Sequence, residues 1–224
     1  MSEKNPKTAI YEYTALVGKA LSSPSRLELL DLLCQGEKSV EILAEKAGLN
    51  VKITSAHLKV LKTARLVEFR RDGRFIHYRA TDPAVTSFWV KFRNLAESRF
   101  LEIQQIAKQF ISSTDQICPY DRKTLLRRAK DGDVVVIDVR PQEEFLAGHL
   151  PFARSMPLAE LKKRLSTLDP KKEIVAYCRG PYCVLSHEAV EILQKKGFRA
   201  SRITDGVIDW LAAGLPVEKC EGVR

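Results

Sequence analysis

The residues best suited to chemistry lie in one short stretch, Tyr177-Cys178-Arg179-Gly180-Pro181-Tyr182-Cys183-Val184. An apolar run over 173–176 leads into it, and a helical pattern over 185–197 that ends in glycine follows it. A buried strand, a tight loop and a helix N-terminus therefore meet at one thiol. Unpaired backbone N–H groups and the helix dipole favour negative charge there. We expect Cys178 to be a nucleophilic thiolate.

A second cysteine, Cys183, follows Cys178 by five residues. It could attack a persulfide on Cys178 or close a disulfide with it. It could equally be a small residue at the start of a helix, and the sequence leaves both open. A phosphatase or an arsenate reductase would need an arginine at position 184 to bind an oxyanion with two hydrogen bonds. That residue is Val184, which argues against both activities.

The elements around this loop predict an α/β domain with a parallel sheet. Buried-strand patterns cover 134–140, 174–177 and 199–203. Helical patterns lie between and beside them, over 123–132, 158–165 and 208–214. Alternating strands and helices place a site at the carboxyl ends of the strands.

The first half of the chain predicts a mainly α domain, a winged helix-turn-helix. Helical patterns cover 9–21, 25–33, 40–47 and 51–64, and Ser39 is the expected N-cap of the third. The last two are short helices joined by a turn with glycine, as in a helix-turn-helix. Alternating runs over 66–71 and 75–80 flank Asp72-Gly73-Arg74, which predicts a hairpin.

Positive charge gathers on these elements. Residues 51–79 hold eight lysines and arginines against two acidic residues, within a chain of net charge +9. Such an excess fits a polyanion, and we expect double-stranded DNA as a partner. We expect Ile53, Leu58 and Leu61 to face the core. The residues that we expect to contact the DNA groove and the DNA phosphates are then Lys52, Thr54, Ser55, His57, Lys59, Arg70, Arg71 and Arg74.

Residues 21–27, 55–61 and the Asp72-Gly73-Arg74 turn resemble the ArsR-type family of small repressors, and the resemblance covers about residues 8–110. It implies a homodimer that represses a promoter and releases DNA on sensing a chemical signal. After Asp82-Pro83 an apolar stripe of helical spacing continues to residue 110. We expect one long helix there that packs a partner copy, or else its own domain.

Five motifs in the second half, over 137–140, 143–145, 148–151, 177–180 and 209–217, resemble a rhodanese (sulfurtransferase) domain. The resemblance implies that Cys178 accepts a sulfane sulfur, becomes a persulfide, and passes the sulfur to a thiol or to cyanide. It assigns Asp138, Arg140 and His149 to holding the loop. Arg179 is the only cation within the loop, which disfavours thiosulfate as the donor.

The cysteine and histidine residues of the first domain limit which metal or chemical signal it could bind. Arsenic sensors of the ArsR type use a Cys-x-Cys before the recognition helix, but residues 38–42 contain no cysteine. Residues 83–112 contain no histidine, so we expect no metal site and no cofactor. Cys34 is either a small buried side chain or a sensor thiol, and Cys118 either an incidental or a sensor thiol.

These observations predict two domains, 1–112 and 113–224, with a linker over 112–115. Five cysteines without a disulfide spacing, no apolar run long enough for a bilayer and no signal-peptide core suggest a cytoplasmic protein without a membrane partner. The leading hypothesis is a repressor that responds to reactive sulfur. The alternatives are a sulfurtransferase with an accessory DNA-binding module and a metal- or arsenite-responsive repressor.

Overall fold

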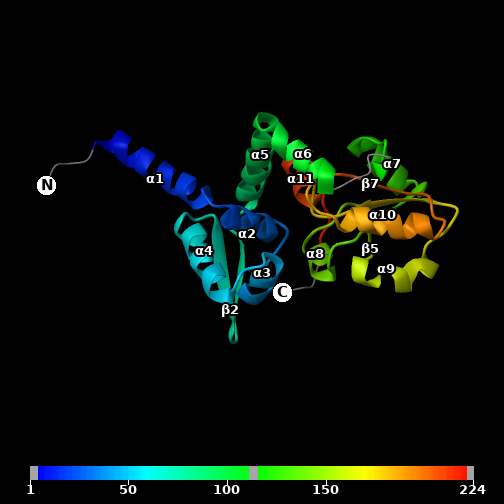
Figure 1. Cartoon of the computed structure of the whole chain (residues 1–224), viewed down its shortest axis with the longest axis horizontal. Coiled ribbons are helices and arrows are strands. Elements are labelled where there is room, and N and C mark those ends of the chain that lie inside the picture. The colour runs from blue at the N-terminus through cyan, green and yellow to red at the C-terminus, as the bar shows by residue number, and fades with distance from the viewer. Residues whose placement is uncertain (1–4, 111–115, 221–224) are drawn as a thin grey trace. The chain divides into compact units, whose positions relative to one another are not determined.

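The computed structural model describes residues 5–110 and 116–220, and the chain divides into two compact units, Met1–Trp89 and Val90–Arg224 (Figure 1). The linker expected over 112–115 lies outside the described residues. Each unit has its own core.

Four helices build most of the first unit: α1 Pro6–Leu21, α2 Pro24–Cys34, α3 Val40–Lys46 and α4 Val51–Thr63. The predicted N-cap of α3 is confirmed, because Ser39 Oγ accepts a hydrogen bond from the Ile42 N–H at 3.3 Å. Asn50 caps α4 in the same way, with 2.8 Å to the Ile53 N–H. Helices α3 and α4 form the predicted helix-turn-helix. The fully buried leucines of this unit are Leu29, Leu30, Leu33, Leu43, Leu58 and Leu61.

The predicted hairpin is also present. Strands β2 Val67–Asp72 and β3 Phe75–Ala80 pair antiparallel from Val67↔Ala80 to Asp72↔Phe75, so that Gly73 and Arg74 form the tip. A short strand, β1 Lys38–Ser39, joins β3 on its other side and gives the order β1-β3-β2. A helix-turn-helix with such a hairpin is a winged helix.

The long helix expected after Asp82 is divided in two. Helix α5 covers Pro83–Arg99 and α6 covers Leu101–Phe110, with Phe100 between them. Neither glycine nor proline stands at the break, so the usual sequence signals of a helix end are missing. The boundary between the two units falls inside α5.

The second unit contains the predicted parallel sheet, in the order β5-β4-β6-β7. Its strands are β4 Val134–Asp138, β5 Arg154–Ser155, β6 Glu173–Tyr177 and β7 Ala200–Arg202. Its helices are α7 Arg122–Lys130, α8 Gln142–Ala147, α9 Leu158–Arg164, α10 Leu185–Lys195 and α11 Val207–Ala212, with a 3-10 turn at Leu165–Thr167.

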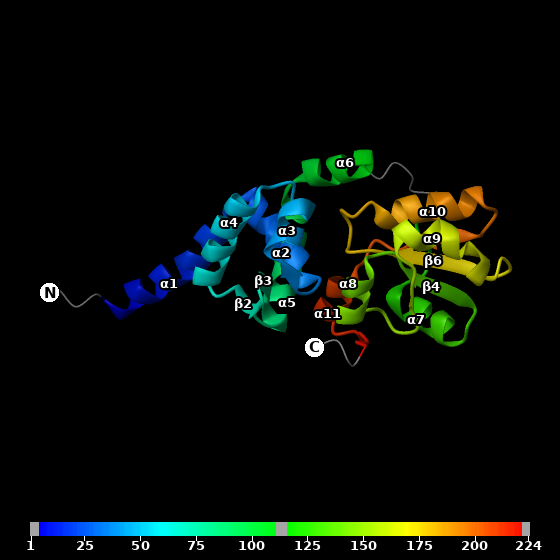
Figure 2. The same cartoon turned by 90° about the horizontal axis from the view of Figure 1, so that it is seen from below.

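Both faces of this sheet are covered (Figure 2). Alternate residues of β4 divide between the faces: Ile137 packs among residues of α9 and α10, and Val136 packs with Leu125 of α7 and Trp210 of α11. The last residues of β4 and β6 are neighbours, Asp138↔Tyr177. The loops that follow both strands therefore leave the sheet at one edge, where the candidate site lies.

Candidate functional site

Cys178 directly follows the last residue of β6 and is only 2% exposed. The chain then turns back, with the Cys183 N–H donating to the Gly180 carbonyl at 3.2 Å, and α10 begins at Leu185. Val184 occupies the N-cap position without a side-chain hydrogen bond. The first N–H groups of α10 are thus available to other acceptors, as the sequence predicted.

Two glycines allow this loop to pack closely. Gly180 has a φ of +147°, a backbone conformation that residues with a Cβ rarely adopt. Gly206, just before α11, lies against the loop, and a Cβ there would be 2.1 Å from the Arg179 carbonyl oxygen. The start of α11 therefore fixes the position of the loop through a contact that only glycine permits.

The loop brings the two cysteines together. Cys178 Sγ lies 3.2 Å from the Cys183 carbonyl oxygen and 3.2 Å from Ser186 Oγ. The thiol of Cys178 therefore contacts the backbone of Cys183 and the first turn of α10.

The two thiols differ in acidity. Burial raises the pKa of Cys178 well above its usual range, and the neighbouring Cys183 raises it further. The hydrogen bond from Cys178, together with those from the Arg179 and Leu185 N–H groups, lowers the pKa of Cys183 to about 6. Burial thus opposes a thiolate at Cys178, whereas the surroundings of Cys183 favour one there, and the two thiols titrate as a pair. The nucleophilic role of Cys178 stays a prediction.

The cation of the loop is already paired. Arg179 Nε and Nη2 contact both carboxylate oxygens of Glu144 at 2.8–3.1 Å, and Glu144 is 1% exposed. Much of the positive charge of Arg179 is thereby compensated inside the protein. Among the remaining loop residues, Tyr182 is 49% exposed, and Pro181 and Val184 are half-buried.

Three further residues have positions that match a structural role. Arg140 Nη2 lies 2.6 Å from Asp138 Oδ2 and 2.7 Å from the Gly148 carbonyl oxygen, and both side chains are buried. His149 Nδ1 lies 2.9 Å from the Phe145 carbonyl oxygen, and its ring stacks on Phe145. These contacts tie the chain after β4 to helix α8.

Sequence reasoning missed Ser186 and Glu144 as members of the site. The signal for Ser186 was a polar residue on the buried face of an amphipathic helix, among Ala189, Val190 and Leu193. Glu144 lies in a motif that the sequence analysis used, but nothing local indicates that its carboxylate binds Arg179. That pairing joins residues 35 positions apart.

In the first unit, α4 and the wing leave seven of the eight expected DNA-binding residues exposed or partly exposed. Lys52 and Lys59 are exposed, Ser55 and His57 are partly exposed, and Arg70, Arg71 and Arg74 are exposed on the wing. Thr54 was assigned wrongly: it is fully buried, and its hydroxyl donates to the Asn50 carbonyl at 3.0 Å. Ile53, expected in the core, is 44% exposed instead. Thr54 shares its face with the buried Leu58 and Leu61, which follow it at helical spacing.

Two family descriptions match the chain. Residues 23–68 match "Bacterial regulatory protein, arsR family", and residues 121–213 match "Rhodanese-like domain". The HTH-type transcriptional regulator Rv0324 of Mycobacterium tuberculosis is 40% identical over 97% of this chain and 95% of its own length. The chain belongs to this family of ArsR-type regulators. Its second half is a rhodanese-like domain.

Other relatives match one domain each. A sulfurtransferase of Allochromatium vinosum is 31% identical over 46% of this chain and 95% of its own length. A solution structure of the homodimeric winged helix-turn-helix domain of a possible ArsR-family regulator from Mycobacterium bovis is 38% identical, with a TM-score of 0.40. It covers 43% of this chain and 90% of that one.

The cations on the wing of the ArsR-type domain differ in their surroundings. Arg70 contacts Glu37 at 2.6 Å and Asp72 at 3.1 Å, and Arg79 contacts Glu68 at 2.6 Å. Arg74 stands at the tip, where its guanidinium lies over the ring of Phe75. Arg71 is exposed on β2 beside the tip. The wing thus combines acid-paired arginines with a positive tip.

The other candidate sensor thiols are held in their protonated form. Burial raises the pKa of Cys34 to about 12 and also raises the pKa of Cys118. Within residues 5–110 and 116–220, no three His, Cys, Asp or Glu residues are grouped to hold a metal ion. No helix in these ranges is both long and apolar enough to cross a bilayer.

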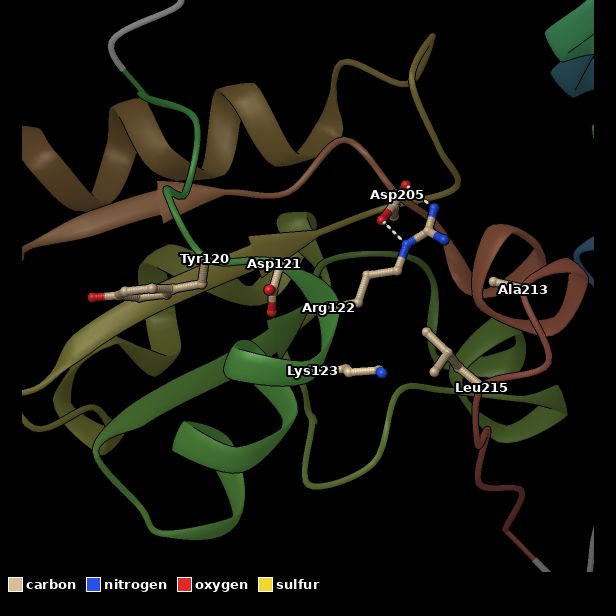
Figure 3. A pocket seen from close by; sticks show the side chains of 7 residues that line it. All are labelled: Tyr120, Asp121, Arg122, Lys123, Asp205, Ala213 and Leu215. Carbon is tan, nitrogen blue, oxygen red and sulfur yellow. Dashed lines mark hydrogen bonds and ion pairs between the residues drawn. The ribbon is translucent and has the colours of Figure 1, made fainter.

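A surface cleft of about 630 Å³ lies elsewhere in the rhodanese-like domain (Figure 3). Tyr120, Arg122, Asp205 and Leu215 are among its lining residues, and the Cys178 loop is not. Arg122 faces Asp205 with two hydrogen bonds of 2.6 and 2.9 Å. Its charge is therefore compensated, and the cleft adds no chemistry to the thiol site.

Proposed function

We propose that this protein is a repressor that responds to reactive sulfur, with Cys178 as the residue that takes up a sulfane sulfur. The observation that carries the proposal is the presence of an ArsR-type DNA-binding domain and a rhodanese-like loop with Cys178 on one chain. Sulfur bound at Cys178 then reduces the affinity for operator DNA.

The electrostatics of the loop support persulfides or polysulfides as the donor class. A rhodanese that uses thiosulfate must hold its sulfite part, an oxyanion, as it leaves, but Glu144 compensates Arg179 here. A persulfide or polysulfide has no oxyanion part and reacts by thiol chemistry alone. The acceptor of the sulfur is a thiol.

Exposed apolar residues support a homodimer. On α1, Ile10 and Tyr13 are 65% and 74% exposed, and on α5 and α6 Leu95 and Ile106 are 54% and 52% exposed. Long helices with apolar residues open to water are typical of surfaces that pack against a second copy. A dimer would present two α4 helices to two half-sites of DNA.

The proposal is tested by DNA binding of the full chain, on a fragment that the protein itself selects from random sequence. Sodium tetrasulfide is expected to weaken binding of the wild type about tenfold or more, the range of ordinary allosteric coupling. The Cys178→Ser variant is expected to bind DNA equally well before and after treatment. Cys220→Ser, which removes an exposed thiol, is the matched control and should respond like the wild type.

Three results would overturn the proposal. Release of DNA by tetrasulfide in Cys178→Ser would place the sensor elsewhere. Failure to select any DNA sequence, together with sulfur transfer at Cys178, would instead make the protein a sulfurtransferase with an accessory DNA-binding module. Stoichiometric binding of Zn(II) or arsenite with DNA release would favour the metal- or arsenite-responsive alternative.

A further inference from the structure

We propose that Cys183 is a second reacting residue of the site, which attacks the persulfide on Cys178, closes a Cys178–Cys183 disulfide and releases hydrosulfide. This inference rests on the proposed function, because it requires that Cys178 takes up sulfur first. In this proposal the site is a redox switch, because two cysteines of the same chain form a disulfide, and it is more than a carrier with a single thiol.

The contacts of the two cysteines carry the proposal. Cys178 Sγ lies 3.2 Å from the backbone carbonyl oxygen of Cys183, so the two residues are in direct contact. Only four residues separate them, within a turn closed by the Cys183–Gly180 hydrogen bond. Attack by one sulfur on the other therefore needs little movement of the chain.

The surroundings of Cys183 suit an attacking thiolate. Cys183 lies two residues before α10, and hydrogen bonding from Cys178 and from the backbone of Arg179 and Leu185 lowers the pKa of its thiol to about 6. It is partly exposed, whereas Cys178 is buried. A spacer residue at this position needs neither the lowered pKa nor the access, and both suit the reactive role.

In the first step, Cys183 is the base that takes the proton of Cys178. Cys178 gives its proton to the Cys183 thiolate, and the Cys178 thiolate attacks the terminal sulfur of a persulfide, R–S–SH. The new bond joins Cys178 Sγ to that sulfur, and R–S⁻ leaves. Cys178 is then a persulfide, Cys178–S–SH, and Cys183 is a thiol that returns its proton to water.

In the second step the Cys183 thiolate attacks Cys178 Sγ. A Cys178–Cys183 bond forms, the bond between Cys178 Sγ and the outer sulfur breaks, and the outer sulfur leaves as HS⁻. The two thiols are oxidised to the disulfide, and the sulfane sulfur is reduced to sulfide. The donor is thus the oxidant, and a reducing thiol restores the resting site.

The sequence makes this product easy to detect in the full-length protein. Trypsin cleaves after Lys172, Arg179 and Lys195, so Cys178 and Cys183 fall on separate peptides, 173–179 and 180–195. After treatment with sodium tetrasulfide, removal of the excess and alkylation without reduction, the wild type is expected to give these two peptides joined by a disulfide. It should also release about one sulfide per chain.

The variants separate this inference from the proposed function. Cys183→Ser, with Cys183→Ala as a second variant, is expected to carry one added sulfur on peptide 173–179 and to release no sulfide. Stable persulfide on Cys178 in the wild type, without joined peptides, would overturn the inference and leave the proposed function standing. No added sulfur on Cys178 in either variant, with none in the wild type, would overturn the proposed function itself.

Discussion

At the scale of single residues, the loop places two thiols with opposite pKa shifts in contact. Burial raises the pKa of Cys178 at the end of β6, whereas hydrogen bonding lowers the pKa of Cys183. The sequence predicted both cysteines and the helix start beside them. It could not predict that their pKa values shift in opposite directions, because these shifts depend on burial between packed layers.

The pH dependence of alkylation tests this difference. The alkylation rate of Cys183 by iodoacetamide should rise with pH, with a midpoint at about 6, and should be constant at higher pH. The reason is that a lowered pKa leaves the thiolate populated at neutral pH. The midpoint should move to higher pH in Cys178→Ala, which loses the largest stabilising contact. Peptide mass spectrometry follows the rate at each pH.

Free glutathione provides the reference for this measurement. An ordinary thiol should show a midpoint of about 8.5. A Cys183 midpoint equal to that of free glutathione would show that its surroundings do not stabilise its thiolate.

At the scale of elements, the order of helices and strands followed from periodicity and turn signals, whereas the orientation of individual faces did not. In α4 the sequence pattern suggested that Ile53 faces the core, but Thr54 takes that place by returning its hydroxyl to the Asn50 carbonyl. A threonine can satisfy its polar group within its own helix and so be buried at little cost. The division at Phe100 has no glycine or proline to signal it.

The wing gives a prediction at this scale. Arg71→Gln should weaken DNA binding and reduce the slope of log K against log salt by about 0.9 for each lost phosphate contact, or twice that for a dimer. Arg79→Gln is the matched control on the paired strand, and it should change the slope little because Arg79 is held by Glu68. Fluorescence anisotropy over a series of salt concentrations gives both slopes.

Equal effects of the two substitutions would show that the contact with Glu68 does not decide which arginine meets phosphate. No effect of either substitution would remove the wing from the DNA interface. The buried Thr54 offers a further comparison, because its replacement by valine should alter stability without altering the salt slope.

At the scale of the whole molecule, one chain combines an ArsR-type domain with a rhodanese-like domain. The family resemblance gave both domains from sequence, since each carries its motifs within a short span. The first domain belongs to a family of DNA-binding regulators, and we propose thiol chemistry for the second. Their presence on one chain is useful for regulation if sulfur at Cys178 changes the affinity for DNA, which is a coupling between two sites.

The most direct test follows both sites in one sample. The full chain on its selected DNA is treated with sodium tetrasulfide, and at each time the fraction of bound DNA and the state of all five cysteines are measured. The account predicts that DNA is lost in step with modification of Cys178, and that dithiothreitol restores both. Loss of DNA while Cys178 is unmodified, or full modification of Cys178 with the DNA still bound, would contradict it.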